Sequence, residues 1–260
     1  MAEMIKVRPT GYARYEELLL ERDALKKQAD IAMDLYVHEF GELTVEVFRS
    51  KVECIRLKKA ISFCQSAVNR GKKPSRVALE KYLQQQMADY EKQLQAMAAH
   101  SEACRELHTS AAYDVEKAKR LYRELAKRLH PDLNPLTRDE PVLLDLWNRV
   151  VIAYHMNAVK DLQELQVLVN QALTALGCDD TLPDIPDLEE RLAELEREIR
   201  QIVTTDPYRY RELLEDEQAK EDRRKELQGQ LEENQQYRQQ LQQALDQLLG
   251  KSGVSPCTLN

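Results

Sequence analysis

Apolar residues recur in steps of three and four along most of this 260-residue chain, a spacing that lines one face of an α-helix. The good helix formers Leu, Ala, Glu, Gln, Lys and Arg dominate, and β-branched residues are few. Only seven glycines are present, which leaves few turns for a β fold. We therefore predict an all-α fold with almost no strand, made of long antiparallel helical or coiled-coil hairpins.

The first region, residues 1–110, is predicted to contain the longest helices. Helical patterns cover residues 12–30 and 31–69. The sequence NRGKKPS at 69–75 breaks the second pattern, and an apolar stripe resumes over 76–108. Because neither helix can bury its apolar stripe alone and the connection between them is short, we expect an antiparallel hairpin. Pairing between two chains, as in a homo-oligomer, would satisfy the same stripes.

The last region, residues 186–250, is expected to form a second helical hairpin. A heptad-like seam runs through residues 188–202. Asp206 is suited to cap the following helix, with Pro207 at its first position. The tail, residues 251–260, is expected to be disordered.

The net charge and the distribution of apolar residues bear on which partners and which location to expect. A formal net charge of −7 argues against nucleic-acid binding, because attraction to phosphates needs a basic face. No apolar stretch approaches the roughly 20 residues that span a bilayer, and the first residues lack the apolar core of a signal peptide. We therefore expect a cytoplasmic protein without a membrane partner.

The cysteines and histidines do not predict a metal site. No CxxC pair occurs, so reduced thiols are expected at all five cysteines. His100, Cys104 and His108 are spaced four residues apart, but one straight helix reaches poorly with all three, and a tetrahedral ion would need a fourth group from elsewhere. We assign no metal. The five cysteines are Cys54, Cys64, Cys104, Cys178 and Cys257.

Nothing in the sequence predicts an enzyme or a bound cofactor. It has no Gly-rich phosphate loop, no Walker pattern and no dinucleotide fingerprint. His38 and His155 have no nucleophile or carboxylate at a compatible spacing.

The most informative segment is residues 115–157, where two amphipathic helices flank a loop with three prolines. Each helix has one apolar face, so the two are expected to pack antiparallel. Pro131 and Pro135 stiffen the loop, Pro141 suits the first position of the next helix, and His130 and Asp132 are expected to project into solvent. The expected core residues are Tyr122, Leu125, Ala126, Leu129, Trp147, Val150, Val151 and Tyr154. The first helix also concentrates Lys117, Lys119, Arg120, Arg123, Lys127 and Arg128, which favours an acidic partner surface.

The strings YRELAKRLHPDLNP and WNRVVIAY in this segment resemble the J-domain family of DnaJ-like co-chaperones. That family typically has YRKLAKKYHPDKNP at the end of its second helix and an aromatic, an aliphatic and Ala-Tyr on the third. The resemblance, over residues 112–157, implies that the basic helix and a signature tripeptide contact a DnaK-type heat-shock chaperone and stimulate its ATPase. The implied chaperone-binding residues are His130, Pro131, Asp132, Lys119, Arg123, Lys127 and Asn134.

The chain departs from the family pattern at several points. Glu124 and Leu133 stand where the family usually has basic residues. The family's first helix, with its Leu-Gly turn, is missing before Val115. The last helix is expected to continue past Tyr154, so that the J-domain-like hairpin occupies residues 111–177.

Two functional hypotheses follow. In the first, the hairpin recruits and activates a DnaK-type ATPase, while the flanking helices bind a client, a partner or another copy. In the second, the protein is a structural coiled-coil adaptor whose J-like hairpin is only a packing unit. Burial of the tripeptide would favour the adaptor, whereas exposure of His130 and Asp132 beside Lys119 and Arg123 would favour the co-chaperone.

Overall fold

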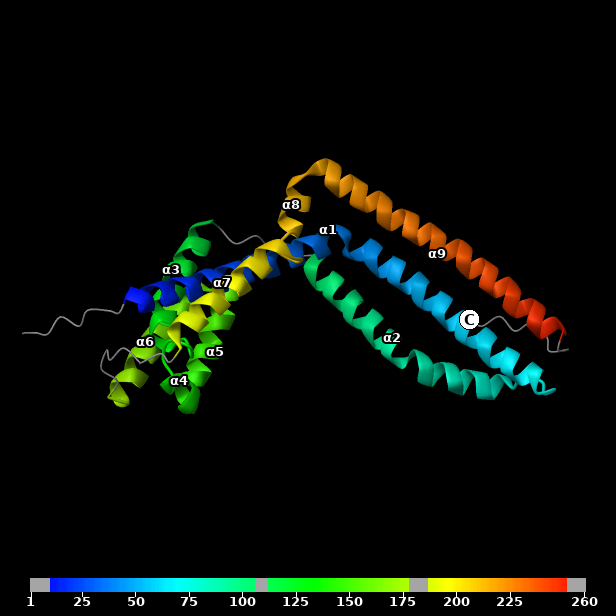
Figure 1. The fold of residues 1–260 in the computed structure, drawn as a ribbon, viewed down its shortest axis with the longest axis horizontal. Coiled ribbons are helices and arrows are strands. Elements are labelled where there is room, and N and C mark those ends of the chain that lie inside the picture. The colour runs from blue at the N-terminus through cyan, green and yellow to red at the C-terminus, as the bar shows by residue number, and fades with distance from the viewer. Residues whose placement is uncertain (1–9, 106–111, 178–186, 252–260) are drawn as a thin grey trace, which may run out of the picture. The chain divides into compact units, whose positions relative to one another are not determined.

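The computed structural model describes residues 10–105, 112–177 and 187–251, which form nine helices and no strand (Figure 1). The prediction of an all-α fold is confirmed. Among the described helices, none combines the length and the apolar character needed to cross a membrane. The expected disordered tail lies almost entirely outside the described residues.

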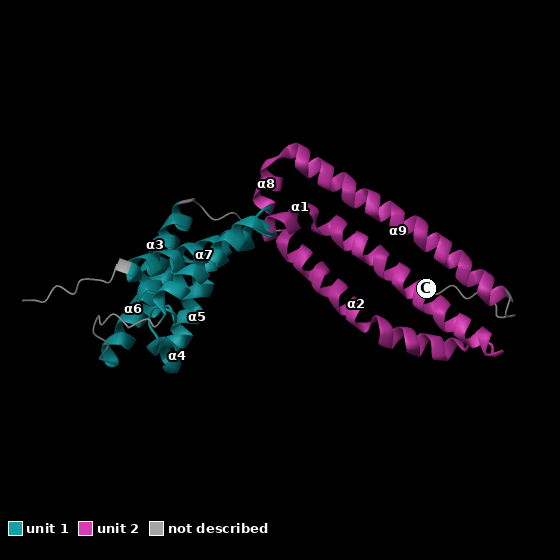
Figure 2. Cartoon of the chain, in the orientation of Figure 1, with its two compact units in different colours: residues 1–32, 108–209 teal, residues 33–107, 210–260 magenta. Residues whose placement is uncertain are grey.

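The chain divides into two compact units, each built from separated stretches of sequence (Figure 2). Unit 1 comprises residues 1–32 and 108–209, and unit 2 comprises residues 33–107 and 210–260. This division differs from the contiguous regions 1–110, 111–177 and 186–250 expected from the sequence. The reason is α1, Thr10–Asn69, a single 60-residue helix that contributes its first part to unit 1 and the rest to unit 2.

The core of unit 1 is formed by α3 (Ala112–Leu129), α5 (Pro141–His155) and α6 (Val159–Ala175). As predicted, α3 and α5 pack antiparallel, and Pro141 begins α5. The rings of Tyr122 and Tyr154 stack at 4.0 Å between their centroids. All the predicted core residues lie in this cluster or pack against it.

The expected continuous last helix is instead two helices. α5 ends at His155, Asn157 adopts a left-handed φ of 52°, and α6 begins at Val159. Lys27 Nζ of α1 lies 2.6 Å from both the Tyr154 carbonyl oxygen and the Asn157 side-chain oxygen, to which it donates. The Tyr154 carbonyl at the end of α5 thus has a partner from α1, and the chain turns so that α6 packs on α3.

A second cluster in unit 1 joins α1 to α7 (Leu188–Thr204) and to the loop before the short α4 (Leu136–Asp139). The predicted heptad seam of α7 supplies one side of it. The cluster consists of Tyr12, Tyr15, Leu18, Leu19, Leu133 and Leu195, with Leu188, Leu192 and Ile199 packed against them.

In unit 2, the second part of α1 packs against α2 (Arg76–Arg105) and α9 (Glu217–Lys251). α2 returns antiparallel to α1, as expected, after a turn in which Gly71 has a φ of 68°. α9 runs parallel to α1 (Figure 1): along the two helices, Arg224 pairs with Glu39 and Arg238 pairs with Glu53. The three helices share a core of Leu57, Ala60, Cys64, Leu79, Leu83, Leu245 and Leu249.

The residues expected to form a C-terminal hairpin, 186–250, are divided between the two units. α7 packs in unit 1, whereas α8 (Tyr210–Glu215) and α9 pack in unit 2. Pro207 lies in the turn between α7 and α8. The cap of α9 is instead Asp216, whose carboxylate accepts from the backbone N–H of Gln218 at 2.8 Å.

Candidate functional site

The His-Pro-Asp loop begins directly at the end of α3. The backbone N–H of His130 donates to the Ala126 carbonyl at 2.8 Å, and the Asp132 N–H donates to His130 Nδ1 at 3.0 Å. Asn134 closes the loop, because its amide donates to the Arg128 carbonyl at 2.8 Å and its side-chain oxygen accepts from the Leu136 N–H at 3.2 Å. The loop is therefore held in one shape by its own polar groups.

His130 does not project into solvent, contrary to the expectation from the sequence. His130 is only 5% exposed, and its ring lies edge-on against the ring of Trp147 of α5, with 4.9 Å between the centroids. Its Nε2 lies 3.3 Å from the Arg22 guanidinium and 3.7 Å from the Asp23 carboxylate, both on α1. The physical reason for the burial is that α1 packs against the loop.

A polar network connects α1 to the tripeptide. Arg22 and Asp23 are paired at 2.9 Å, and Asp23 also accepts from the Tyr122 hydroxyl at 2.6 Å. Arg22 extends to within 3.8 Å of Asp132, which is only partly exposed. Burial lowers the pKa of His130 below its ordinary 6.5, although the nearby carboxylates oppose this shift. This direction favours the neutral form of the imidazole.

Leu133, the residue where the family usually has a base, lies in the apolar cluster between α1 and α7 and is 1% exposed. A lysine or arginine would leave its charge without water there. This departure from the family pattern therefore has a structural reason: the side chain anchors the tripeptide loop beneath α1 and α7.

The predicted basic face of α3 remains accessible in part. Arg123 and Lys127 are exposed, and Lys119 is half-buried. Lys127 forms an ion pair of 2.8 Å with Glu16 of α1. The other departure, Glu124, is exposed and accepts from the Gln166 amide of α6 at 3.1 Å, so it connects α3 to α6.

The remaining predicted site residues are close to these. Pro131 and Asn134 are half-buried, and Asp132 pairs with Arg138 of α4. The structure therefore brings His130, Pro131, Asp132 and Asn134 together in one loop, with Lys127 one turn earlier on α3. Lys119 and Arg123 lie further towards the start of the same helix.

Sequence reasoning missed the α1 residues Arg22, Asp23 and Lys27, which contact this hairpin. They belong to a highly charged helix whose ionic side chains are the usual sign of a solvated face. The one available signal was Leu133, an apolar residue in a loop expected to be polar.

Lys27 provides a test of this packing through pH. Burial lowers the pKa of Lys27 from 10.5 to about 8, so between pH 8 and 10.5 the unfolded chain binds a proton that the folded chain has released. The free energy of unfolding of the wild type should therefore rise across this window relative to Lys27→Met, and the difference should be flat below pH 8. Urea denaturation of both proteins at several pH values measures it. A pH-independent difference would contradict the buried position of Lys27.

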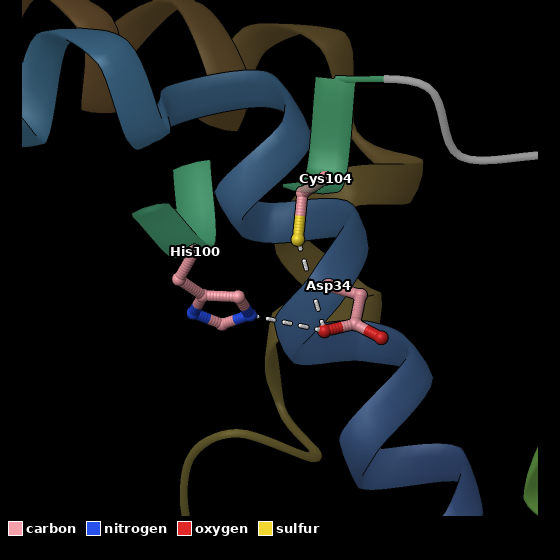
Figure 3. Close-up of side chains that lie close together, drawn as sticks. All are labelled: Asp34, His100 and Cys104. Carbon is pink, nitrogen blue, oxygen red and sulfur yellow. Dashed lines mark hydrogen bonds and ion pairs between the residues drawn. The ribbon is translucent and has the colours of Figure 1, made fainter. Parts of the chain in front are cut away.

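Among the described residues, one group has mixed metal-ligand chemistry: Asp34, His100 and Cys104 of unit 2 (Figure 3). The third residue considered from the sequence, His108, lies outside the described residues, as do Cys178 and Cys257. Cys54, Cys64 and Cys104 are free thiols, all buried.

Comparisons with known proteins assign no family: no family model matches the chain, and neither a curated protein nor a solved structure matches it.

Proposed function

We propose that this protein is a J-type co-chaperone that stimulates a DnaK-type ATPase through the loop His130–Asp132, and that α1 and α7 hold this loop in a covered state. The proposal rests on one arrangement above all. The tripeptide joins two antiparallel helices, α3 and α5, at the end of a helix whose Arg123 and Lys127 remain exposed. An acidic chaperone surface would approach along that basic face.

The polar residues that α1 places against the tripeptide loop support a reversible contact between α1 and the loop. Arg22, Asp23 and Asp132 form a largely buried ionic network beside the His130 ring, and such networks often contribute no more stability than apolar packing of the same volume. A permanent contact needs no such groups, whereas a contact that opens leaves them ready to be solvated. Covered and uncovered states that differ by a few kcal/mol are then both accessible.

The test is single-turnover ATP hydrolysis by the host's own DnaK-type chaperone with and without this protein. We expect the wild type to stimulate hydrolysis and Asp132→Asn to reduce the rate to that of the chaperone alone, since the resemblance assigns the carboxylate to the chaperone contact. The matched control is Arg138→Gln, which removes the ion pair between Arg138 and Asp132 but leaves the tripeptide intact, and it should retain stimulation. An Asp132→Asn variant as active as the wild type would refute the proposal.

A second candidate function is a structural adaptor in which the hairpin is only a packing unit. The burial of His130 favours it, by the criterion set from the sequence. This candidate predicts no stimulation by any form of the protein, including variants in which the cover is removed. Measuring such variants therefore separates the two functions.

A further inference from the structure

Three potential ligand atoms of different chemistry converge in unit 2, where α1 and α2 lie side by side (Figure 3). His100 and Cys104 are one turn apart on α2, so both point to the same side of that helix. Asp34 of α1 faces them: its Oδ1 lies 3.3 Å from His100 Nε2 and 3.9 Å from Cys104 Sγ. All three ligand atoms lie within 4.8 Å of one another.

These separations are near those of ligands around one small ion. Zinc binds nitrogen, oxygen and sulfur at about 2.0–2.3 Å in a tetrahedron, which places neighbouring ligand atoms about 3.3–3.8 Å apart. The two separations from Asp34, 3.3 and 3.9 Å, match this range closely, and the third, which is within 4.8 Å, reaches it with a side-chain adjustment of at most about 1 Å. A metal ion bound by His100 and Cys104 needs a further ligand from outside α2, and Asp34 of α1 supplies one.

The ligand types select the class of metal. A thiolate with an imidazole and a carboxylate suits zinc and similar transition metals, whereas magnesium and calcium prefer oxygen ligands only. Cys104 is buried, and its burial together with the nearby Asp34 raises the pKa of its thiol. A dication would reverse the effect of Asp34, since it neutralises the carboxylate and stabilises the thiolate.

A further contact orients the cysteine. His38, one turn after Asp34 on α1, donates from Nδ1 to the Cys104 backbone carbonyl at 2.8 Å. This bond fixes the end of α2 against α1 and so holds Cys104 opposite Asp34. His38 itself is not one of the three residues whose ligand atoms converge.

We propose that Asp34, His100 and Cys104 form a binding site for one zinc-class divalent ion, with its fourth position taken by water. Each residue supplies one atom: a carboxylate oxygen, His100 Nε2 and Cys104 Sγ. The site joins α1 to α2 near the end of α2 that is distant in sequence from the 69–75 turn. It is independent of the proposed co-chaperone function, because no residue of the tripeptide network takes part.

The experiment uses the full chain, stripped of metal with a chelator and titrated with Zn²⁺ in a calorimeter. We expect one ion per chain, and a loss of affinity of roughly tenfold or more in His100→Ala, Cys104→Ser and Asp34→Asn, because even residues that only orient a ligand contribute 10–100-fold. Titration with Co²⁺ should give a thiolate charge-transfer absorption that Cys104→Ser lacks.

Two variants serve as matched controls. His155 forms a similar ion pair with Asp30, 3.5 Å apart, so His155→Ala removes an equivalent histidine, and Cys64→Ser removes another buried thiol. Both should bind Zn²⁺ like the wild type. Circular dichroism establishes that each variant keeps its helices. If the stripped protein takes up no Zn²⁺, or if the three site variants bind it as tightly as the wild type, the proposal is overturned.

Discussion

Leu133→Lys is expected to uncover the tripeptide loop and to increase the stimulation of a DnaK-type ATPase severalfold over the wild type. Leu133 is 1% exposed among apolar side chains of α1 and α7. Removing a buried leucine typically costs about 2–5 kcal/mol, and an unpaired ammonium group adds to this. The lysine therefore reaches water only if the loop separates from its cover. The change also restores the basic residue that the J-domain family usually has at this position.

The fluorescence of Trp147 should report the separation of the loop from α1 and α7 without any chaperone present. It is the only tryptophan in the chain and lies against the His130 ring, so separation of the loop from α1 changes its surroundings. Val142→Lys, at a position that is 60% exposed, adds the same charge without touching the cover and should behave as the wild type. An emission spectrum identical to that of the wild type, together with no gain in stimulation, would show that the cover does not limit access.

Leu129→Ala is expected to lower the free energy of unfolding of unit 1 by about 2–5 kcal/mol, the usual range for a buried leucine replaced by alanine. Leu129 is fully buried in the cluster formed by α3, α5 and α6, immediately before His130. Because neighbouring side chains only partly fill the resulting cavity, contacts are lost on both α3 and α5. Urea denaturation followed by the Trp147 signal measures the change.

The control for this variant is Val167→Ala on α6, where the side chain is 55% exposed and its truncation should change stability little. A loss of less than about 1 kcal/mol in Leu129→Ala would mean that the α3–α5 hairpin is not packed as a core.

Local spacing was enough to predict the all-α fold and the core of the α3–α5 hairpin. The apolar faces of Tyr122 to Leu129 and of Trp147 to Tyr154 meet in one cluster, and α1 with α2 forms the expected antiparallel pair. Such features depend on residues three and four apart on one helix. They do not depend on which distant segment packs against that helix.

The contacts made by α1 could not be predicted in this way. Its charged residues Arg22, Asp23 and Lys27 would appear on any solvated helix, and their role comes from partners more than 90 residues away in sequence. The break between α5 and α6 has the same origin, because Asn157 turns the chain where Lys27 binds the end of α5. Asp34 likewise meets His100 and Cys104 only through helix pairing.

The helices that pack against the His130–Asp132 loop, α1 and α7, are also synthesised at different times. Translation delivers a chain from its N-terminus at ~5–20 residues per second, so α1 and the tripeptide leave the ribosome before α7 has been made. For an interval on the order of seconds, Leu133 therefore lacks its neighbour Leu195, and only α1 is present to pack against the loop. Under the proposed function, a chaperone close to the ribosome would encounter this protein first with its loop covered by α1 but not by α7.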